Sequence, residues 1–167
     1  MLNVALAHYQ DPQDVQAVVT LLDGYASEPS GGGQPLAPEV KARLLAEMAA
    51  RPQIFSVLAW AGEGDVRQAV GLINCVEGFS TFAARPLINV HDVVVLANWR
   101  GQGVGKAMFE CVEREAIRRG ACKLTLEVLA GNAPARRLYE KEGFAPYTLD
   151  SAWGDAMMWQ KKLTSAC

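Results

Sequence analysis

An apolar strand that continues through glycines into an amphipathic helix is the feature that most constrains this chain. The β-branched stretch LINVHDVVVL (residues 87–96) is followed by the turn RGQGVGK (100–106), and residues 104–120 then repeat apolar side chains on one helical face. Residues 122–130 have the composition of another strand. Because parallel strands need a right-handed crossover, residues 87–129 predict a βαβ unit with its helix packed on a sheet.

The rest of the chain alternates strand and helix patterns. Further strands are predicted at residues 3–9, 54–60, 66–79 and 155–163, and further helices at 11–26, 37–52 and 132–143. Asp11 and Asn132 are the expected N-caps of two of these helices. The stretch SEPSGGGQPL (27–36) indicates a surface loop. With 167 residues and half of them hydrophobic, residues 1–167 suit one domain.

Charge and composition exclude several classes of protein. A net charge of −2 argues against binding of nucleic acid through a basic surface. The first residues carry no basic leader, and no apolar run is long enough to cross a membrane. Four cysteines without a C-x-x-C pair predict free thiols, as expected of a cytoplasmic protein without a structural metal site; they are Cys75, Cys111, Cys122 and Cys167.

The glycine turn has the chemistry of an anion site. The first N–H groups of a helix have no partner within the helix, and the helix dipole adds positive charge there. Phosphate is the anion that such a turn most often binds. Arg100 and Lys106, at the two edges of the turn, reinforce this preference.

Spacing separates the glycine motifs that could explain the turn. A P-loop requires glycine at position 100 and serine or threonine at position 107, where this chain has Arg100 and Ala107. A dinucleotide fingerprint counted from Gly101 requires glycine at Lys106, and counted from Gly103 it meets Met108. Neither motif is therefore present.

The spacing that fits is Arg100-x-x-Gly103-x-Gly105, and a second motif follows it downstream. This second motif lies in LEVLAGNAPARRLYEKEGF and consists of Asn132, Ala135, Tyr139, Gly143 and Phe144. In this order, separated by a helix and a strand, the two motifs resemble the GNAT superfamily of N-acetyltransferases. A tight turn without a ligand and a simple helix cap are the alternatives for Gly103 and Asn132.

The resemblance implies both a fold and a coenzyme site. The expected fold is α+β in three layers, α/β/α, with about four helices and a mixed, mostly antiparallel sheet of about six to seven strands around the parallel βαβ unit. Acetyl-CoA is the implied coenzyme, its pyrophosphate held by the turn and its pantetheine arm by the strand. The residues expected to bind it are Val93, Val94, Val95, Arg100, Gly101, Gln102, Gly103, Val104, Gly105, Lys106, Asn132, Ala135 and Tyr139.

Acetyl transfer requires a proton acceptor and a proton donor. An alkyl ammonium titrates near 10 in water, so a base must accept a proton before or during attack of the amine on a thioester. Polyamine-type members carry that base at the position of His91, and histone-type members carry it at Asn89, which cannot serve as one. Imidazole is largely neutral at pH 7, so His91 suits the role, although a hydrogen-bonded strand histidine is equally compatible. Strand alternation points Asp92 to the opposite face unless a bulge intervenes.

Tyr139 is the expected acid. The resemblance assigns its hydroxyl to the coenzyme sulfur, where it would protonate the departing thiolate, while a backbone N–H of Val94 or Val95 would meet the oxyanion. An aromatic core residue is the alternative for Tyr139.

On the acceptor side, the resemblance points to the loop between the first two helices and to the segment before the central strand. These supply Tyr25, Glu28, Glu77, Phe79 and Phe82 beside His91. Acidic and aromatic groups suit a cationic amine, and an ordinary solvated loop is the alternative.

The expected function is transfer of an acetyl group from acetyl-CoA to a primary amine of a small molecule, such as a polyamine, an amino acid or an aminoglycoside-like compound. Acetylation of a peptide or protein amine, and a non-catalytic acyl-CoA binding module, are the alternatives. A homodimer is left open, because the sequence identifies no interface.

Overall fold

A computed structural model describes residues 1–150, 152 and 154–163, and within them five strands form a single sheet whose order follows the chain. The strands are β1 (Leu2–Leu6), β2 (Ile54–Ala61), β3 (Gln68–Ser80), β4 (Arg85–Val95) and β5 (Leu124–Leu126). The helices of the same residues are α1 (Pro12–Ser27), α2 (Pro38–Ala49), α3 (Val104–Arg118) and α4 (Ala133–Lys141), with three short 3₁₀ turns at Pro29–Gly31, Gly64–Val66 and Ala97–Trp99.

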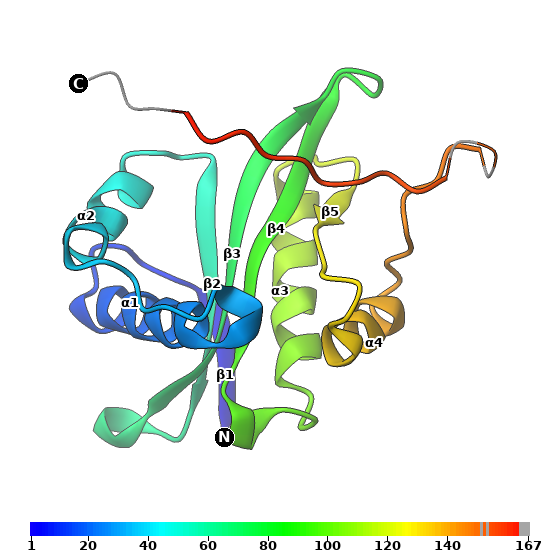
Figure 1. Cartoon of the computed structure of the whole chain (residues 1–167). Helices are drawn as coiled ribbons and strands as arrows, with labels where there is room; N and C mark the ends of the chain where they lie inside the picture. The colour runs from blue at the N-terminus through cyan, green and yellow to red at the C-terminus, as the bar shows by residue number, and fades with distance from the viewer. Residues whose placement is uncertain (151, 153, 164–167) are drawn as a thin grey trace.

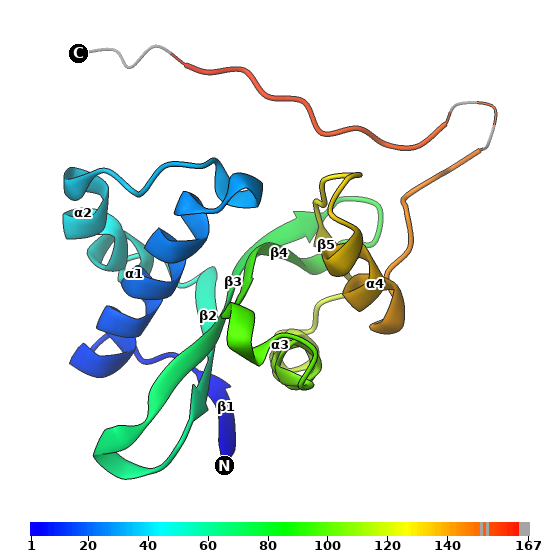
Figure 2. The ribbon, with the colours of Figure 1, turned by 60° about the horizontal axis from the view of Figure 1, so that its bottom comes forward.

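The sheet lies between two helical layers (Figures 1 and 2). Helices α1 and α2 cover one face, and α3 and α4 cover the other. The first four strands pair antiparallel, whereas β4 and β5 pair in parallel with α3 crossing between them. The expected three-layer α+β architecture and its βαβ unit are thus confirmed, and β2 and β3 form an antiparallel hairpin.

Local signals account for where the helices begin. The Asp11 side chain accepts a hydrogen bond from the Gln13 N–H at 2.9 Å and caps α1. Asn132 caps α4 by accepting from the Ala135 N–H at 3.3 Å. Both expected caps are present.

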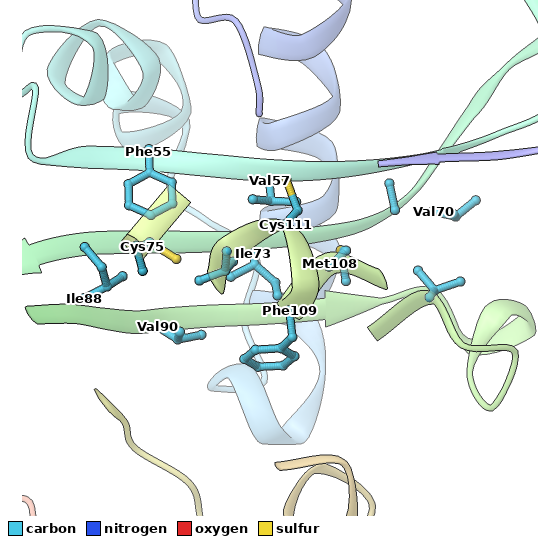
Figure 3. Packing of buried hydrophobic residues seen from close by; sticks show 14 of the residues in the cluster. Phe55, Val57, Val70, Ile73, Cys75, Ile88, Val90, Met108, Phe109 and Cys111 are labelled. Carbon is cyan, nitrogen blue, oxygen red and sulfur yellow. The ribbon is translucent and has the colours of Figure 1, made fainter. Parts of the chain in front are cut away.

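Strand alternation divides the apolar residues between two cores. Val57 and Ile73 face α3, while the neighbouring Leu58 and Leu72 face α1. Figure 3 shows the α3 core, in which Phe109 is fully buried. Burial of both faces holds the sheet rigid between its helices, which positions the end of β4 and the start of α3.

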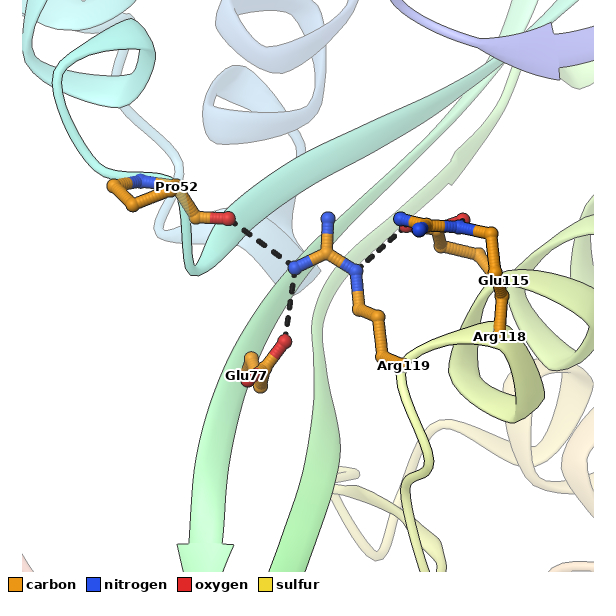
Figure 4. A network of polar contacts seen from close by, with 5 residues as sticks. All are labelled: Pro52, Glu77, Glu115, Arg118 and Arg119. Atoms are coloured by element: carbon orange, nitrogen blue, oxygen red, sulfur yellow. Dashed lines mark hydrogen bonds and ion pairs between the residues drawn. The ribbon is translucent and has the colours of Figure 1, made fainter.

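A half-buried arginine ties the end of α3 to the sheet (Figure 4). Arg119 donates hydrogen bonds to Glu115 at 2.6 Å, to Glu77 at 2.9 Å and to the Pro52 carbonyl at 3.2 Å. Its guanidinium also lies 4.4 Å from the centre of the Phe55 ring. This one side chain therefore joins α3, β3 and the start of β2.

The strand predicted at residues 155–163 is wrong. Beyond an isolated bridge between Thr148 and Asp155, this segment does not join the sheet, and it runs clear of the strands in Figure 2. Met157, Met158 and Trp159 are consecutive, so the segment lacks the alternation that would bury one face and set a register. Strand β5 is also shorter than the predicted range 122–130, and the described residues form five strands where about six to seven were expected.

Three of the four cysteines can be located. Cys75, Cys111 and Cys122 are free thiols, and burial raises the pKa of Cys75 and of Cys111. Cys167 lies outside the described residues. Of the helices in the described part of the chain, none is long and apolar enough to cross a membrane.

Loss of the Glu115 carboxylate is expected to flatten the dependence of stability on pH. Hydrogen bonds from Arg118 and then Arg119 lower the pKa of this buried carboxyl to about 2. A carboxyl with a lowered pKa stabilises the fold above its unfolded pKa, and that contribution disappears as the pH falls from about 5 towards 2. In Glu115→Gln, urea unfolding should show lower stability at pH 7 and a smaller fall below pH 5. The exposed Glu110→Gln on the same helix is the control, and equal acid sensitivity of wild type and Glu115→Gln would contradict this assignment.

Candidate functional site

The turn between β4 and α3 presents backbone donors to solvent. Gly101 and Gly103 have φ angles of +75° and +82°, which favour glycine. Gly103 is the N-cap of α3 and no side chain caps the helix, so the first N–H groups are left for a ligand. A Cβ on Gly105 would approach the Leu138 side chain to 2.9 Å, which shows how closely α3 and α4 pack here.

A cavity of about 680 Å³ extends from this turn between β4 and α4. The residues predicted from the sequence that line it are Tyr25, Glu28, His91, Val93, Val94, Val95, Arg100, Gly101, Gly103, Val104, Gly105, Lys106, Asn132, Ala135 and Tyr139. Segments far apart in the chain thus meet in one cleft.

The cleft exists because β4 and β5 part. They pair only over three positions, from Ile88 with Leu124 to Val90 with Leu126. Beyond Val90, β4 still pairs with β3 on one edge, and its other edge faces the cavity. An open strand edge of this kind can pair with an extended amide-bearing ligand.

Tyr139 lies at the inner part of the cleft within an aromatic cluster. Its ring meets Phe109 edge-on with 5.8 Å between centroids, and meets Phe144 at 6.1 Å. Burial, and then the charge of Tyr25, raise the pKa of Tyr139 to about 12. The phenol therefore stays protonated at neutral pH and can donate a hydrogen bond into the cavity.

A β-bulge beside the cleft changes which face of the sheet the side chains of β4 point to. Asn74 of β3 pairs with Asp92 and the next residue, Cys75, pairs with Val90, so His91 is the extra residue. Val90 consequently belongs to the α3 core, whereas Val94 belongs to the α1 core. His91 is exposed at the cleft, with its Nδ1 3.2 Å from the Asn89 side-chain oxygen.

The bulge joins Asp92 to a buried chain of hydrogen bonds. The Asn74 amide donates to Asp92 at 3.0 Å, and the Ser56 hydroxyl donates to the Asn74 oxygen at 2.6 Å. Because the Ser56 proton is used there, the Tyr9 hydroxyl donates to Ser56 at 2.8 Å. All three donors point towards the carboxylate, which holds Asp92 on the α1 side of the sheet.

Arg100 bridges the two walls of the cleft. Its Nη2 donates to both carboxylate oxygens of Glu28, at 2.8 and 3.1 Å, and its Nε donates to the Val95 carbonyl at 2.8 Å. The residue that opens the glycine motif therefore contacts the end of α1 as well as β4.

Three predicted acceptor residues and one coenzyme residue lie away from the cleft. Glu77 is held by Arg119. Phe79 is 63% exposed and Phe82 fully exposed, because β3 and β4 continue past the cleft as a two-stranded ribbon that ends near them (Figure 1). The Gln102 side chain turns back to donate to the Asn98 carbonyl at 2.6 Å.

Two cations in the cleft were missed from the sequence. Arg137 and Lys141 of α4 line the same cavity as the glycine turn. With Pro134 and Leu138 they repeat at i, i+3, i+4 and i+7, the spacing of one helical face, and this signal could have identified them.

A second cavity, of about 660 Å³, lies along α1 and adjoins the first. The two share Tyr25, Glu28, Val94 and Val95. Burial, followed by the charges of Asp92 and Glu28, raises the pKa of Tyr25. Within the described residues, no His, Cys, Asp and Glu side chains gather as a metal site.

Removal of the Asn74 side chain is expected to destabilise the fold. Asn74→Ala leaves the buried Ser56 hydroxyl and the Asp92 carboxylate without their partner, which should lower the free energy of unfolding by about 1–3 kcal/mol. The exposed Asn98→Ala should change it by less than about 0.5 kcal/mol. Chemical denaturation measures both changes. Equal stability of wild type and Asn74→Ala would show that this buried series of hydrogen bonds contributes nothing to the fold.

Comparison with known proteins agrees with these features. The sequence profile of the acetyltransferase (GNAT) family matches residues 20–144. The streptothricin acetyltransferase of Streptomyces lavendulae is 37% identical over 87 residues, which cover 50% of this chain and 46% of that protein. The thialysine N-ε-acetyltransferase of Bos taurus is 30% identical over 100 residues, which cover 60% of this chain and 58% of that protein. The chain thus spans about half the length of the curated relatives it matches.

A solved structure shares the fold across almost the whole chain. The crystal structure of a probable acetyltransferase superposes with a TM-score of 0.79 at 18% identity, covering 98% of this chain and 99% of the other. At that identity the likeness establishes the fold alone. With the family profile matching most of the chain, and with the glycine turn and the parted strands in place, the chain belongs to the acetyltransferase (GNAT) family.

Proposed function

We propose that this chain is an acetyl-CoA-dependent N-acetyltransferase that acts on a primary amine of a small molecule. One observation carries the proposal: the uncapped helix turn, the open edge of β4 and the protonated Tyr139 line a single cleft. A phosphate site, an amide-pairing edge and a proton donor are what the three parts of an acyl-coenzyme require.

The residues of the cleft fit coenzyme A. The N–H groups at the start of α3 would hold its pyrophosphate, and Lys106, Arg137 and Lys141 would supply positive charge around the phosphates. The β4 edge at Val93 to Val95 would pair with the amides of the pantetheine arm. The coenzyme itself would supply the acetyl thioester.

Proton transfer on the coenzyme side would depend on Tyr139. A departing thiolate needs a donor, and the pKa of about 12 keeps the Tyr139 hydroxyl protonated throughout the neutral range. A backbone N–H of Val94 or Val95 would stabilise the oxyanion that forms during attack.

On the acceptor side, His91 would accept the proton of the amine. It lies exposed at the bulge, where it can act directly or through a water molecule. After burial, the charges of Asp92 and Glu28 contribute to the raised pKa of Tyr25, so these two carboxylates lie close enough to it to attract an ammonium group bound there.

The second cavity favours a small-molecule acceptor. Its volume of about 660 Å³ falls in the range typical of small-ligand pockets. The names of the two relatives, a streptothricin and a thialysine acetyltransferase, support the same substrate class. Acetylation of a peptide amine and coenzyme binding without turnover are the two competing outcomes.

The test measures coenzyme binding and transfer separately. Isothermal titration with coenzyme A establishes binding. Release of free thiol from acetyl-CoA is then followed with polyamines, amino acids, aminoglycosides and short peptides against a background without amine. Release with a small amine supports the proposal, release with peptides alone favours a protein acceptor, and binding without release favours the non-catalytic module.

Tyr139→Phe is expected to lower kcat by roughly 10²–10⁴-fold, because the thiolate loses its proton donor. Affinity for coenzyme A should stay within about twofold, since the aromatic packing with Phe109 and Phe144 is retained. Tyr147→Phe, at a tyrosine that is 57% exposed, is the matched control and should behave as wild type. Unchanged turnover in Tyr139→Phe would remove Tyr139 from the mechanism.

A further inference from the structure

Glu28 occupies the junction between the two cavities. It lines both the coenzyme cleft and the cavity along α1, and no other carboxylate among the described residues lines that second cavity. The remaining polar groups there are neutral, apart from Arg67, which donates to Gln13 at 2.6 Å and stacks 4.2 Å above Trp60. An ammonium group bound in this cavity would therefore have Glu28 as its anionic partner.

Glu28 is already paired in the structure. Both of its carboxylate oxygens accept hydrogen bonds from Arg100, the residue directly before the glycine turn. The two side chains are 52% and 41% exposed for Arg100 and Glu28, so this pair is open to solvent and to ligands. Exposed pairs of this kind contribute little stability, and a phosphate is a strong competitor for a guanidinium.

The main chain at Glu28 is fixed independently of its side chain. The Glu28 N–H donates to the Tyr25 carbonyl at 2.9 Å, and the Glu28 carbonyl accepts from the N–H groups of Gly31 at 2.9 Å and Gly33 at 3.0 Å. Breaking the contact between Glu28 and Arg100 therefore requires only rotation of a side chain, and the Glu28 carboxylate stays at the junction of the two cavities.

We propose that Arg100 is shared between Glu28 and the phosphates of coenzyme A, so that coenzyme binding frees the Glu28 carboxylate to hold the ammonium group of the acceptor. This inference rests on the proposed function and deepens it. Arg100 becomes a positioning residue that acts on the acceptor through Glu28. The preferred acceptor is an amine with one ammonium group and a neutral polar body, because the cavity offers one carboxylate among amides and hydroxyls, with Arg67 as its one cation among the described residues.

The two sites are then coupled. Before the coenzyme binds, Arg100 neutralises the Glu28 carboxylate. After the coenzyme binds, that carboxylate is free to hold the ammonium group of the acceptor. By linkage, each ligand strengthens the binding of the other to the same extent.

A double-mutant cycle on coenzyme A binding tests the sharing of Arg100. Isothermal titration with coenzyme A alone compares wild type, Glu28→Gln, Arg100→Gln and the double variant. Glu28→Gln should tighten binding by about threefold or more when Arg100 is present, because its competitor is gone, and should have no such effect in the Arg100→Gln background. Glu127→Gln removes a charge from the same cleft without touching Arg100, so its effect should be equal in both backgrounds.

An equal effect of Glu28→Gln with and without Arg100 would overturn the inference, since the effect would then be general electrostatics. No effect in either background would overturn it as well. Failure of the unmodified chain to bind coenzyme A would instead refute the proposed function. The two failures are thus distinguishable.

A second titration tests the release of Glu28. Glucosamine, an amine with a neutral hydroxylated body, is titrated by ligand-observed NMR with and without saturating coenzyme A. Its affinity should rise by about threefold or more with the coenzyme in wild type and should not rise in Glu28→Gln. No gain in wild type would contradict the release of the carboxylate.

Discussion

The short pairing between β4 and β5 is the constraint on which the cleft depends. Three residue pairs hold the two strands together, and past them the strands separate while β4 remains paired with β3. The β4 edge is thereby exposed beside the turn into α3 and opposite α4. Longer pairing would close the space in which all the candidate residues meet.

Much of the fold could be predicted because local signals agree with the global arrangement. The caps Asp11 and Asn132, the glycines at 101 and 103, and the βαβ pattern each act through neighbouring residues, so their effects are visible in the chain order. The same holds for the residues that line the coenzyme side of the cleft. Their spacing on one strand, one turn and one helix is enough to bring them together.

The acceptor side was predicted less well, because it depends on long-range geometry. The bulge at His91 redirects Asp92, and its partners Asn74 and Ser56 lie on other strands. Glu77 carries the right charge for an amine site, yet it lies on a strand that leads away from the cleft and is bound by Arg119. The segment 155–163 has strand-like composition without alternation, so composition alone misled the prediction.

The two sides of the cleft are built from different segments of the chain. The proposed coenzyme side is built mainly from one continuous stretch, from β4 to α4, whereas the cavity along α1 is lined by α1 together with residues of β2, β3 and β4. Substitutions in α1 can reshape the proposed acceptor cavity while the turn and the β4 edge stay intact. Under the proposed function, new acceptor preferences can therefore evolve by change in α1, with Arg100 as the residue that must remain compatible with both sides of the cleft.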